Sequence, residues 1–342
     1  MHLIRAVAAA MLLVSPAAFA EEAFDLEAAI AAQFPPDTGP FMGDWRGRWS
    51  PEEEKDPELG AQIIGRGNGL YEIHLLPALY ARCEPYAVVT VQEKNGALEF
   101  ESGRYSGRVT ADGFTGRRTE DGKSKAATFR LERSVPTSPT LGLAPPAGAV
   151  TLFDGTGLDA WEINPEGPWG IRDASLMSIH PKGKQLVSKQ RFKDVSVHVE
   201  FCLPYLPEKT GQSRANGGVF LQGEYEIQVL DSYGLPGYFV ECGALYKVCA
   251  PKVNMCYAPN VWQTYDIDFT APKFGPDGKQ IANARITVRH NGVLIHTDEE
   301  IPMLPTNSYK DRIKPHPREP GSFELQAHGN HVKYRNIWVL EK

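Results

Sequence analysis

The sequence has 342 residues, with 36 Lys and Arg against 42 Asp and Glu, and a formal net charge of −6. This mildly acidic balance argues against a nucleic-acid binder that relies on a large basic surface. The 42% hydrophobic and 10% aromatic residues exclude wholesale disorder, and the length suggests about two domains. The 32 Gly and 27 Pro follow no collagen period, so they indicate many turns between short strands.

The N-terminal segment has the pattern of a secretory signal peptide. Arg5 precedes an apolar run at 6–14, and Ala18-Phe19-Ala20 has the small residues of a cleavage site. The apolar run is shorter than the roughly 20 residues that a bilayer span needs, and no later segment approaches that length. We therefore predict a signal peptide at 1–20, no membrane span, and a periplasmic or secreted protein.

In such an oxidising compartment the cysteines can form disulfides. The sequence has five of them: Cys83, Cys202, Cys242, Cys249 and Cys256. A zinc site is the weaker interpretation, because structural zinc sites favour ligands that lie closer together in pairs. We expect a Cys242–Cys256 disulfide that brackets one loop, and an odd total leaves at least one thiol unpaired or intermolecular.

The first half of the mature chain divides into three predicted segments. Residues 21–38 form a short leader whose apolar residues recur four apart, which predicts a helix that Pro35-Pro36 ends. Residues 39–134 alternate strand-like runs with turn signals such as Asn95-Gly96, so we expect a small antiparallel β domain. Residues 135–148 are rich in Pro, Ser, Thr and Gly, which is typical of a linker.

Residues 149–342 again show only strands and turns. The run 195–201 alternates apolar and polar residues without a break, and Asn291-Gly292 is a hairpin signal between two later runs. Short, spaced strands over about 190 residues predict an all-β, two-sheet sandwich of jelly-roll type.

Seven pieces of this second domain carry a resemblance to a known family. The first is the opening at 151–161 with the pattern L-F-D-G-x-x-L-x-x-W. The second is Asn216-Gly217-Gly218-Val219-Phe220-Leu221, where Gly218 and the preceding Ala215 depart from the family pattern. The others are the run 225–231, the loop at 243–252 with Lys247 in place of a usual glycine, Trp262-Gln263-Thr264-Tyr265, Asn291-Gly292-Val293, and Gln326-Ala327-His328-Gly329 followed by 334–337. In this order they are similar to the 3-keto-disaccharide hydrolase domain, also described as 3-keto-glucoside lyase and hydratase. The resemblance covers 149–342 and implies a concanavalin-like jelly roll that acts on oxidised sugars.

The alternation of the strands predicts which polar side chains point away from the core. Glu226 and Gln228 share one face, as do Glu324, Gln326 and His328, and as do His198 and Glu200. Glu, Gln, His and Asp suit sugar hydroxyls, metals and proton transfer better than the Lys, Thr and Ser of ordinary solvated faces. On a concave jelly-roll sheet such a face would form a groove. We expect sugar hydroxyls to be held by Gln228, Gln326, Glu200, Asn216, Gln222 and Glu324.

The family resemblance implies cleavage by elimination, which requires a base, an acid and a positive charge near the enolate. We expect Glu226 or Asp231 to be the base and His328 or Tyr246 to be the acid. Lys252 or a divalent metal would stabilise the enolate oxygen, and Glu226, Asp231 and His328 are the candidate metal ligands. The predicted partner is an oligosaccharide or glycoside.

Two other functions remain open from the sequence. Glu226-x-Gln228-x-x-Asp231 resembles the acidic signature of laminarinase-type glycosidases, but a retaining mechanism requires two carboxyls about 5–5.5 Å apart and a carboxylate where Gln228 stands. A non-catalytic carbohydrate-binding module is the second alternative, because jelly rolls also serve as lectins. The aglycone, the oligomeric state and the role of the first domain do not follow from the sequence.

Overall fold

The computed structural model describes residues 26–51, 58–179, 183–304 and 314–342. The regular secondary structure of the described chain is almost entirely antiparallel strands, with one short helix, α1 (Leu26–Gln33), and one 3₁₀ turn, η1 (Gly211–Ser213). The predicted signal peptide at 1–20 lies outside the described residues, so it and the location that it implies stay predictions. No helix of the described part is long and apolar enough to cross a membrane.

The N-terminal domain is one antiparallel sheet with the strand order β4-β3-β2-β1-β8-β7-β6-β5. Its core contains both tryptophans of the first strand, Trp45 and Trp49, which pack edge-on against Phe114 and Phe129. The predicted small β domain is thereby confirmed. The strands are β1 (Gly43–Ser50), β2 (Glu58–Gly65), β3 (Leu70–Leu76), β4 (Ala87–Gln92), β5 (Leu98–Ser102), β6 (Tyr105–Thr110), β7 (Gly113–Arg118) and β8 (Ala127–Ser134).

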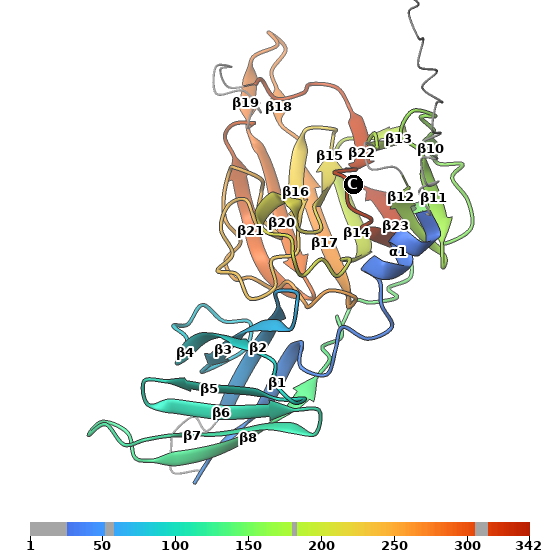
Figure 1. Ribbon diagram of the computed structural model, residues 1–342. Helices are drawn as coiled ribbons and strands as arrows, with labels where there is room; N and C mark the ends of the chain where they lie inside the picture. The colour runs from blue at the N-terminus through green and yellow to red at the C-terminus, as the bar shows by residue number, and fades with distance from the viewer. Residues whose placement is uncertain (1–25, 52–57, 180–182, 305–313) are drawn as a thin grey trace, which may run out of the picture.

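The C-terminal domain packs two antiparallel sheets face to face, as predicted for a jelly roll (Figure 1). One sheet has five strands: β10 (Trp161–Glu162), β13 (Leu186–Phe192), β22 (Gly321–Leu325), β15 (Gly217–Leu221) and β16 (Tyr225–Val229). The other has eight strands including β9 at its side: β9 (Val150–Phe153), β11 (Trp169–Arg172), β12 (Ser175–Ser178), β23 (Lys333–Glu341), β14 (Val195–Cys202), β17 (Trp262–Thr270), β20 (Ala284–His290) and β21 (Val293–Ile301). A small ribbon of β18 (Lys273–Phe274) and β19 (Gln280–Ala282) lies apart from both.

The core of this domain lies between the two sheets because each strand alternates its side chains. In β14, Val195, Val197, Val199 and Phe201 all enter one buried cluster with the apolar residues of β15, β16 and β22. The predicted hairpin signal Asn291-Gly292 joins β20 to β21, and both of its residues have the positive φ that this turn requires.

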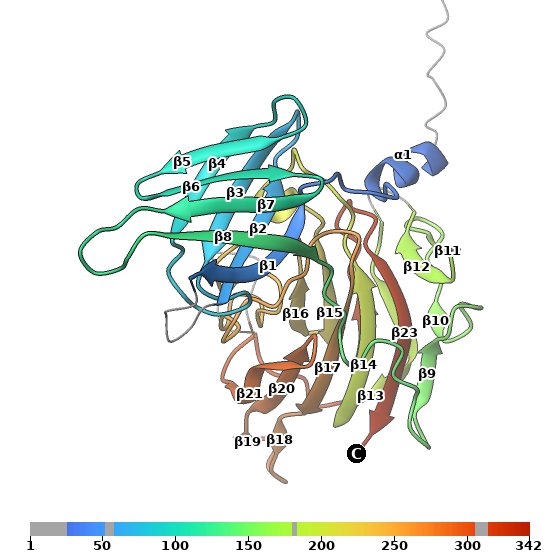
Figure 2. The same ribbon diagram turned by 90° about the horizontal axis from the view of Figure 1, so that it is seen from below.

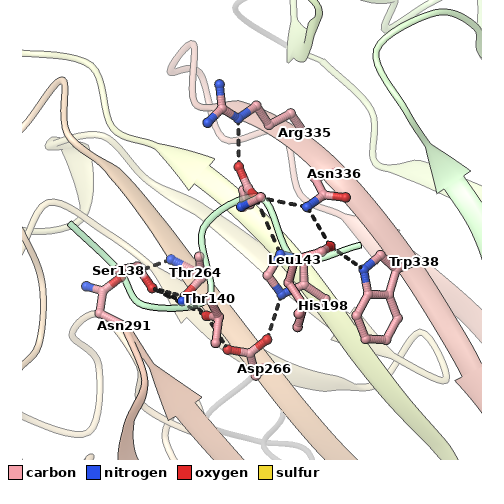
Figure 3. Close-up of polar contacts among 12 residues, drawn as sticks. Ser138, Thr140, Leu143, His198, Thr264, Asp266, Asn291, Arg335, Asn336 and Trp338 are labelled. Carbon is pink, nitrogen blue, oxygen red and sulfur yellow. Dashed lines mark hydrogen bonds and ion pairs between the residues drawn. The ribbon is translucent and has the colours of Figure 1, made fainter. Parts of the chain in front are cut away.

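The segment predicted as a linker, 135–148, does not run free between the domains. Part of it lies along the outer face of the eight-stranded sheet, across β17, β14 and β23 (Figure 3). Ser138 and Thr140 bond the side chains of Thr264 and Asp266, while the Gly142 N–H donates to Glu200 Oε1. We call residues 138–143 the strap.

The N-terminal domain lies against the loops at one end of the sandwich, whereas α1 lies near β11 and β12 (Figure 2). The Tyr233 hydroxyl donates to Asp44 Oδ1 at 2.8 Å across the domain boundary, where burial raises the pKa of Asp44. Arg82 donates to the backbone carbonyls of Gly237, Pro251 and Lys252. These contacts join the first domain to the loops that carry the family motifs.

The predicted Cys242–Cys256 disulfide is not formed, because all five cysteines are free thiols. The two thiols are buried beside each other, within hydrogen-bonding distance, and each has a further polar neighbour. Cys242 Sγ lies 3.2 Å from the Tyr265 hydroxyl, and Cys256 Sγ donates to the Tyr257 carbonyl oxygen at 3.4 Å.

Candidate functional site

The edge strand β16 directs Glu226 and Gln228 to the outer face of the five-stranded sheet. The alternating residues Tyr225, Ile227 and Val229 are buried in the core. Because successive side chains of a strand point to opposite sides, Glu226 and Gln228 both point away from that core. This arrangement is the one that the sequence predicts.

The neighbouring strands place further polar groups beside these two. Phe220 of β15 is the register partner of Glu226 on one side and of Glu324 on the other. In the adjacent row, Gly218 pairs with Gln228, and the Gln326 N–H donates to the Gly218 carbonyl oxygen. Two lateral rows therefore cross the outer face, one containing two carboxylates and one containing two amides.

Gly218 leaves an opening in the middle of these rows. A Cβ at this position would lie 2.8 Å from Glu226 Oε1 and 2.9 Å from the Phe220 ring. The Glu226 carboxylate therefore leans over the glycine, and any larger residue would displace it. The missing side chain makes Gly218 the floor on which a ligand would meet Glu226.

The segment 243–249 extends the sheet beyond β16. Ala244 and Glu226 accept backbone bonds from Gln228 and Tyr246 at 3.0 and 3.1 Å, and Ile227 pairs with Leu245. This antiparallel pairing sets Tyr246 directly beside Glu226 on the same face, at the roughly 4.5–5.5 Å Cβ spacing of cross-strand neighbours. The structure thus brings the predicted base and one predicted acid together.

Lys247 is a member of the site that the sequence reasoning treated only as a departure. Its φ of 59° lies in the left-handed region, which explains why the family resemblance calls for glycine here. The ammonium lies 5.1 Å from the Tyr246 ring centroid, and its charge lowers the pKa of Glu226. The unusual residue therefore supplies a positive charge next to the candidate base.

Glu226 has the most informative electrostatics of the site. Burial in an apolar surrounding raises the pKa of its carboxyl to about 7, and the opposing effect of Lys247 is smaller. At neutral pH the carboxyl therefore exists in both protonation states. A carboxylate with a pKa near the operating pH is well suited to general acid–base chemistry.

Gln212 organises a cluster of side-chain amides at the end of β15 and β16. Its Oε1 accepts from Asn216 Nδ2 and from Gln228 Nε2, both at 3.1 Å. Within the described part of the chain, the buried amide oxygens that have no hydrogen-bond partner include three beside this cluster, those of Asn216, Gln228 and Gln326. Buried acceptors without partners are costly, so the cluster is suited to accept hydrogen bonds from water or a polyol.

Asp231 does not serve as a second free carboxylate, contrary to one prediction. The strand ends at Val229, and Asp231 Oδ2 lies 2.5 Å from Arg214 Nε while Oδ1 accepts from the Tyr233 N–H. Both residues are almost fully buried, so the carboxylate is committed to an internal ion pair. Sequence reasoning missed Arg214, although it lies just before Asn216 in a matched motif.

His328 and Lys252 are also separate from Glu226. His328 is exposed beyond the end of β22, and the Lys252 ammonium donates to Thr297 Oγ1 of β21, in the other sheet. The described residues contain no group of three or more His, Cys, Asp or Glu able to hold a metal ion. The predicted metal site of Glu226, Asp231 and His328 is therefore not formed.

Three of the predicted sugar-binding residues have other surroundings. Glu200 is buried in the eight-stranded sheet beneath the strap, so it cannot reach the same ligand as Glu226. Gln222 lies in the β15–β16 turn and donates to the Glu319 carbonyl oxygen. Glu324 shares the row of Glu226 but accepts a bond from Ser322. Asn216, Gln228 and Gln326 remain as the polar set nearest to Gly218.

The fold and this site define a carbohydrate-active jelly-roll protein, and comparison with known proteins specifies the family. Residues 148–340 match the model of the 3-keto-alpha-glucoside-1,2-lyase-like domain, which is more than half of the chain. The protein belongs to this family, as its sequence motifs predict.

A solved structure that is 35% identical agrees with that assignment. It is a candidate glycosyl hydrolase from Parabacteroides distasonis, with a TM-score of 0.53 over 61% of this chain and 90% of its own. A second one from the same organism is 14% identical, with a TM-score of 0.41 over 57% and 94% of the two chains. The carbohydrate-binding module CBM66 of Bacillus subtilis is also 14% identical, with a TM-score of 0.27 over 56% and 93%. These last two likenesses are distant. No curated protein matches the chain.

Proposed function

We propose that the protein cleaves 3-keto-glycosides by elimination of the aglycone followed by addition of water. The observation that carries this proposal is Glu226, a carboxyl with a pKa of about 7 that leans over Gly218 beside Tyr246. Membership of the family supplies the substrate class, and the site supplies a base of suitable strength.

In the first step, Glu226 removes the proton from C2 of the sugar. The ketone at C3 makes this proton acidic, because the electron pair of the broken C–H bond moves into an enolate. The Lys247 ammonium, whose charge acts on Glu226, also opposes the negative charge that forms on the enolate oxygen. Positioned proton transfer of this kind contributes about 10²–10⁴-fold to a rate.

In the second step, the enolate collapses and the C1–O bond to the aglycone breaks. The leaving oxygen takes a proton from Tyr246, which lies on the same face as Glu226. Water then adds to the new C1=C2 bond, with hydroxyl at C1 and a proton at C2, so that the net reaction is hydrolysis. The unpartnered amide oxygens of Asn216, Gln228 and Gln326 accept hydrogen bonds from the sugar hydroxyls.

Retaining glycoside hydrolysis fits the site less well. That mechanism requires a second carboxylate about 5–5.5 Å from the first. Asp231, the residue that the motif spacing offers for this role, is paired with Arg214. Glu324, the other carboxylate of the row, lies two strands from Glu226 and accepts from Ser322. Elimination requires only one carboxylate base, which Glu226 supplies.

The decisive experiment offers a 3-keto-glucoside to the enzyme in deuterated water, with and without a chelator. We expect release of the aglycone and deuterium at C2 of the sugar product in both cases. Unoxidised glucans serve as the control substrate. Cleavage of those glucans without turnover of the keto substrate would overturn the proposal.

A further inference from the structure

A cleft of about 670 Å³ lies between the N-terminal domain and the loops of the jelly roll. Its walls are formed by β3 and the loop that follows it on one side, and by residues 234–238 and 254–256 on the other. This volume is within the roughly 300–1,000 Å³ typical of ligand sites, which occur preferentially at domain interfaces. None of the residues used in the proposed mechanism lines it.

The two walls of the cleft are held at a fixed separation. Arg82 extends from the N-terminal domain and donates to the Gly237 carbonyl oxygen at 3.3 Å, besides its bonds to the carbonyls of Pro251 and Lys252. The Tyr233–Asp44 hydrogen bond joins the same two domains. Because these contacts join the two walls directly, binding requires little ordering of the walls.

The charges on the walls are largely balanced within the protein. Glu72 accepts from His74 Nε2 at 2.5 Å and from Arg66 Nη2 at 2.9 Å, and these bonds lower the pKa of its carboxyl to about 2. The remaining charges on the walls, Arg82 and Glu84, have opposite signs. The walls therefore carry no excess of one charge sign, so the cleft favours an uncharged ligand with hydrogen-bonding groups.

An exposed aromatic side chain stands at the cleft. Tyr238 is 60% exposed, and Val88 on the opposite wall is 51% exposed. The backbone of Tyr238 is fixed, because Glu241 Oε2 accepts from the N–H groups of Gly237 and Tyr238 at 2.6 and 2.8 Å. An amphipathic ring on a rigid loop suits the apolar face of a sugar, with polar groups nearby for its hydroxyls.

The loop that carries Tyr238 also borders the catalytic face. The Val240 carbonyl oxygen accepts from Gln228 Nε2, and the Phe239 carbonyl oxygen accepts from the Lys247 N–H at 2.9 Å. Val240 follows Tyr238 by two residues, and two residues of extended chain span at most about 7 Å. The backbone of Tyr238 therefore lies within about 7 Å of the backbone of Val240, which bonds Gln228. The cleft and the proposed catalytic face are therefore neighbours across one short segment.

We propose that this interdomain cleft is a carbohydrate subsite that binds the sugar units of the aglycone, while the oxidised ring lies at Glu226. The proposal rests on the function proposed above and assigns a role to the N-terminal domain. The enzyme would accordingly prefer keto-glycosides whose aglycone is itself a sugar.

The test compares two substrates and two variants. kcat/KM is measured for a 3-keto-disaccharide and for 3-keto methyl glucoside, with wild type, Tyr238→Ala and the control Ile281→Ala, whose side chain is 69% exposed on β19. The ratio is kcat/KM for the disaccharide divided by kcat/KM for the methyl glucoside. We expect Tyr238→Ala to lower this ratio about five- to tenfold, as the loss of one stacking contact predicts. The ratio stays at the wild-type value in Ile281→Ala.

A titration with maltotriose and cellotriose separates failure of the subsite from failure of the proposed function. Wild type is expected to bind at least one of them, and Tyr238→Ala to bind it about tenfold more weakly. Such binding without turnover of any keto substrate would overturn the proposed function and keep the subsite. The subsite alone would be overturned if both keto substrates were turned over with an unchanged ratio in Tyr238→Ala and neither trisaccharide bound.

Discussion

The two outer faces of the jelly roll carry the same residue types in very different surroundings. On the eight-stranded sheet, His198 lies 2.6 Å from Asp266 and 3.6 Å from Glu200, under the strap (Figure 3). Glu200 also accepts from Arg335 and Asn336. These interactions lower the pKa of Glu200 to about 2, against the opposing effect of its burial.

On the five-stranded sheet, burial is not compensated in this way. Glu226 is opposed only by the nearby charge of Lys247, and burial raises the pKa of its carboxyl to about 7. A buried carboxylate that accepts from several hydrogen-bond donors therefore stabilises the fold, whereas one that lacks such donors is available for proton transfer. Residue type alone does not distinguish the two.

The largest expected effect is on turnover by Glu226→Gln. Removing the base should lower kcat for a 3-keto-glucoside by about 10²–10⁴-fold, while the unfolding midpoint stays at or above that of wild type because a costly buried carboxyl is removed. Steady-state kinetics and thermal melting check this. A lectin would show no turnover even as wild type, and Glu226→Gln would only weaken its binding of sugar. That pattern, or full turnover by Glu226→Gln, would contradict the assignment.

Glu200→Gln is the matched change on the other face. It removes a charge that interacts with Arg335 and His198, so we expect a loss of about 3 kcal/mol in the free energy of unfolding. Below the melting temperature kcat should stay within a factor of about two of wild type. A loss of turnover as large as that of Glu226→Gln would show that the strapped face participates in catalysis.

The lowered pKa of Glu200 predicts that the stability of the protein depends on pH. Because the pKa of Glu200 is lowered to about 2 in the folded state, its stabilising contribution is present above its usual value of 4.5 and is lost as the pH falls toward 2. Denaturant titrations between pH 5 and 3 should therefore show falling stability in wild type and a smaller fall in Glu200→Gln. Equal slopes would indicate that other carboxyls dominate this range.

Gly218→Ala tests the opening beneath Glu226. The new methyl group would meet Glu226 Oε1 at 2.8 Å, and the flexible carboxylate would move aside while the strand remains paired. A displacement of about 1 Å at a catalytic group can cost up to about 100-fold, so we expect kcat to fall by about ten- to 100-fold. Wild-type kcat with an altered KM would restrict Gly218 to substrate binding.

The smallest effect is expected for Lys247→Ala. Its removal deletes the charge that lowers the pKa of Glu226, so the acidic limb of the rate profile should move to higher pH. At pH 6 this predicts a roughly two- to fivefold larger loss of kcat/KM than at pH 9, where only the effect of Lys247 on the enolate remains. An equal loss at both pH values would indicate that Lys247 acts on the enolate alone and does not influence the base.

The fold followed from the sequence because strand alternation and turn residues are local signals. Glu226 and Gln228 lie on one face, as predicted, since their strand keeps a period of two. Asp231 and Lys252 are not in the cluster around Glu226, because they bond the long-range partners Arg214 and Thr297, which no spacing reveals. Glu200 was misassigned for the same reason, since the chain crosses back over it as the strap.

The pH dependence of kcat/KM for a 3-keto-glucoside shows whether Glu226 is the base. If Glu226 is the base, kcat/KM rises tenfold per pH unit at low pH and levels off with a midpoint near 7, the pKa that burial gives this carboxyl. The residual activity of Glu226→Gln should lack this limb. A midpoint near 4 to 5, or a limb near 7 that persists in Glu226→Gln, would contradict the assignment.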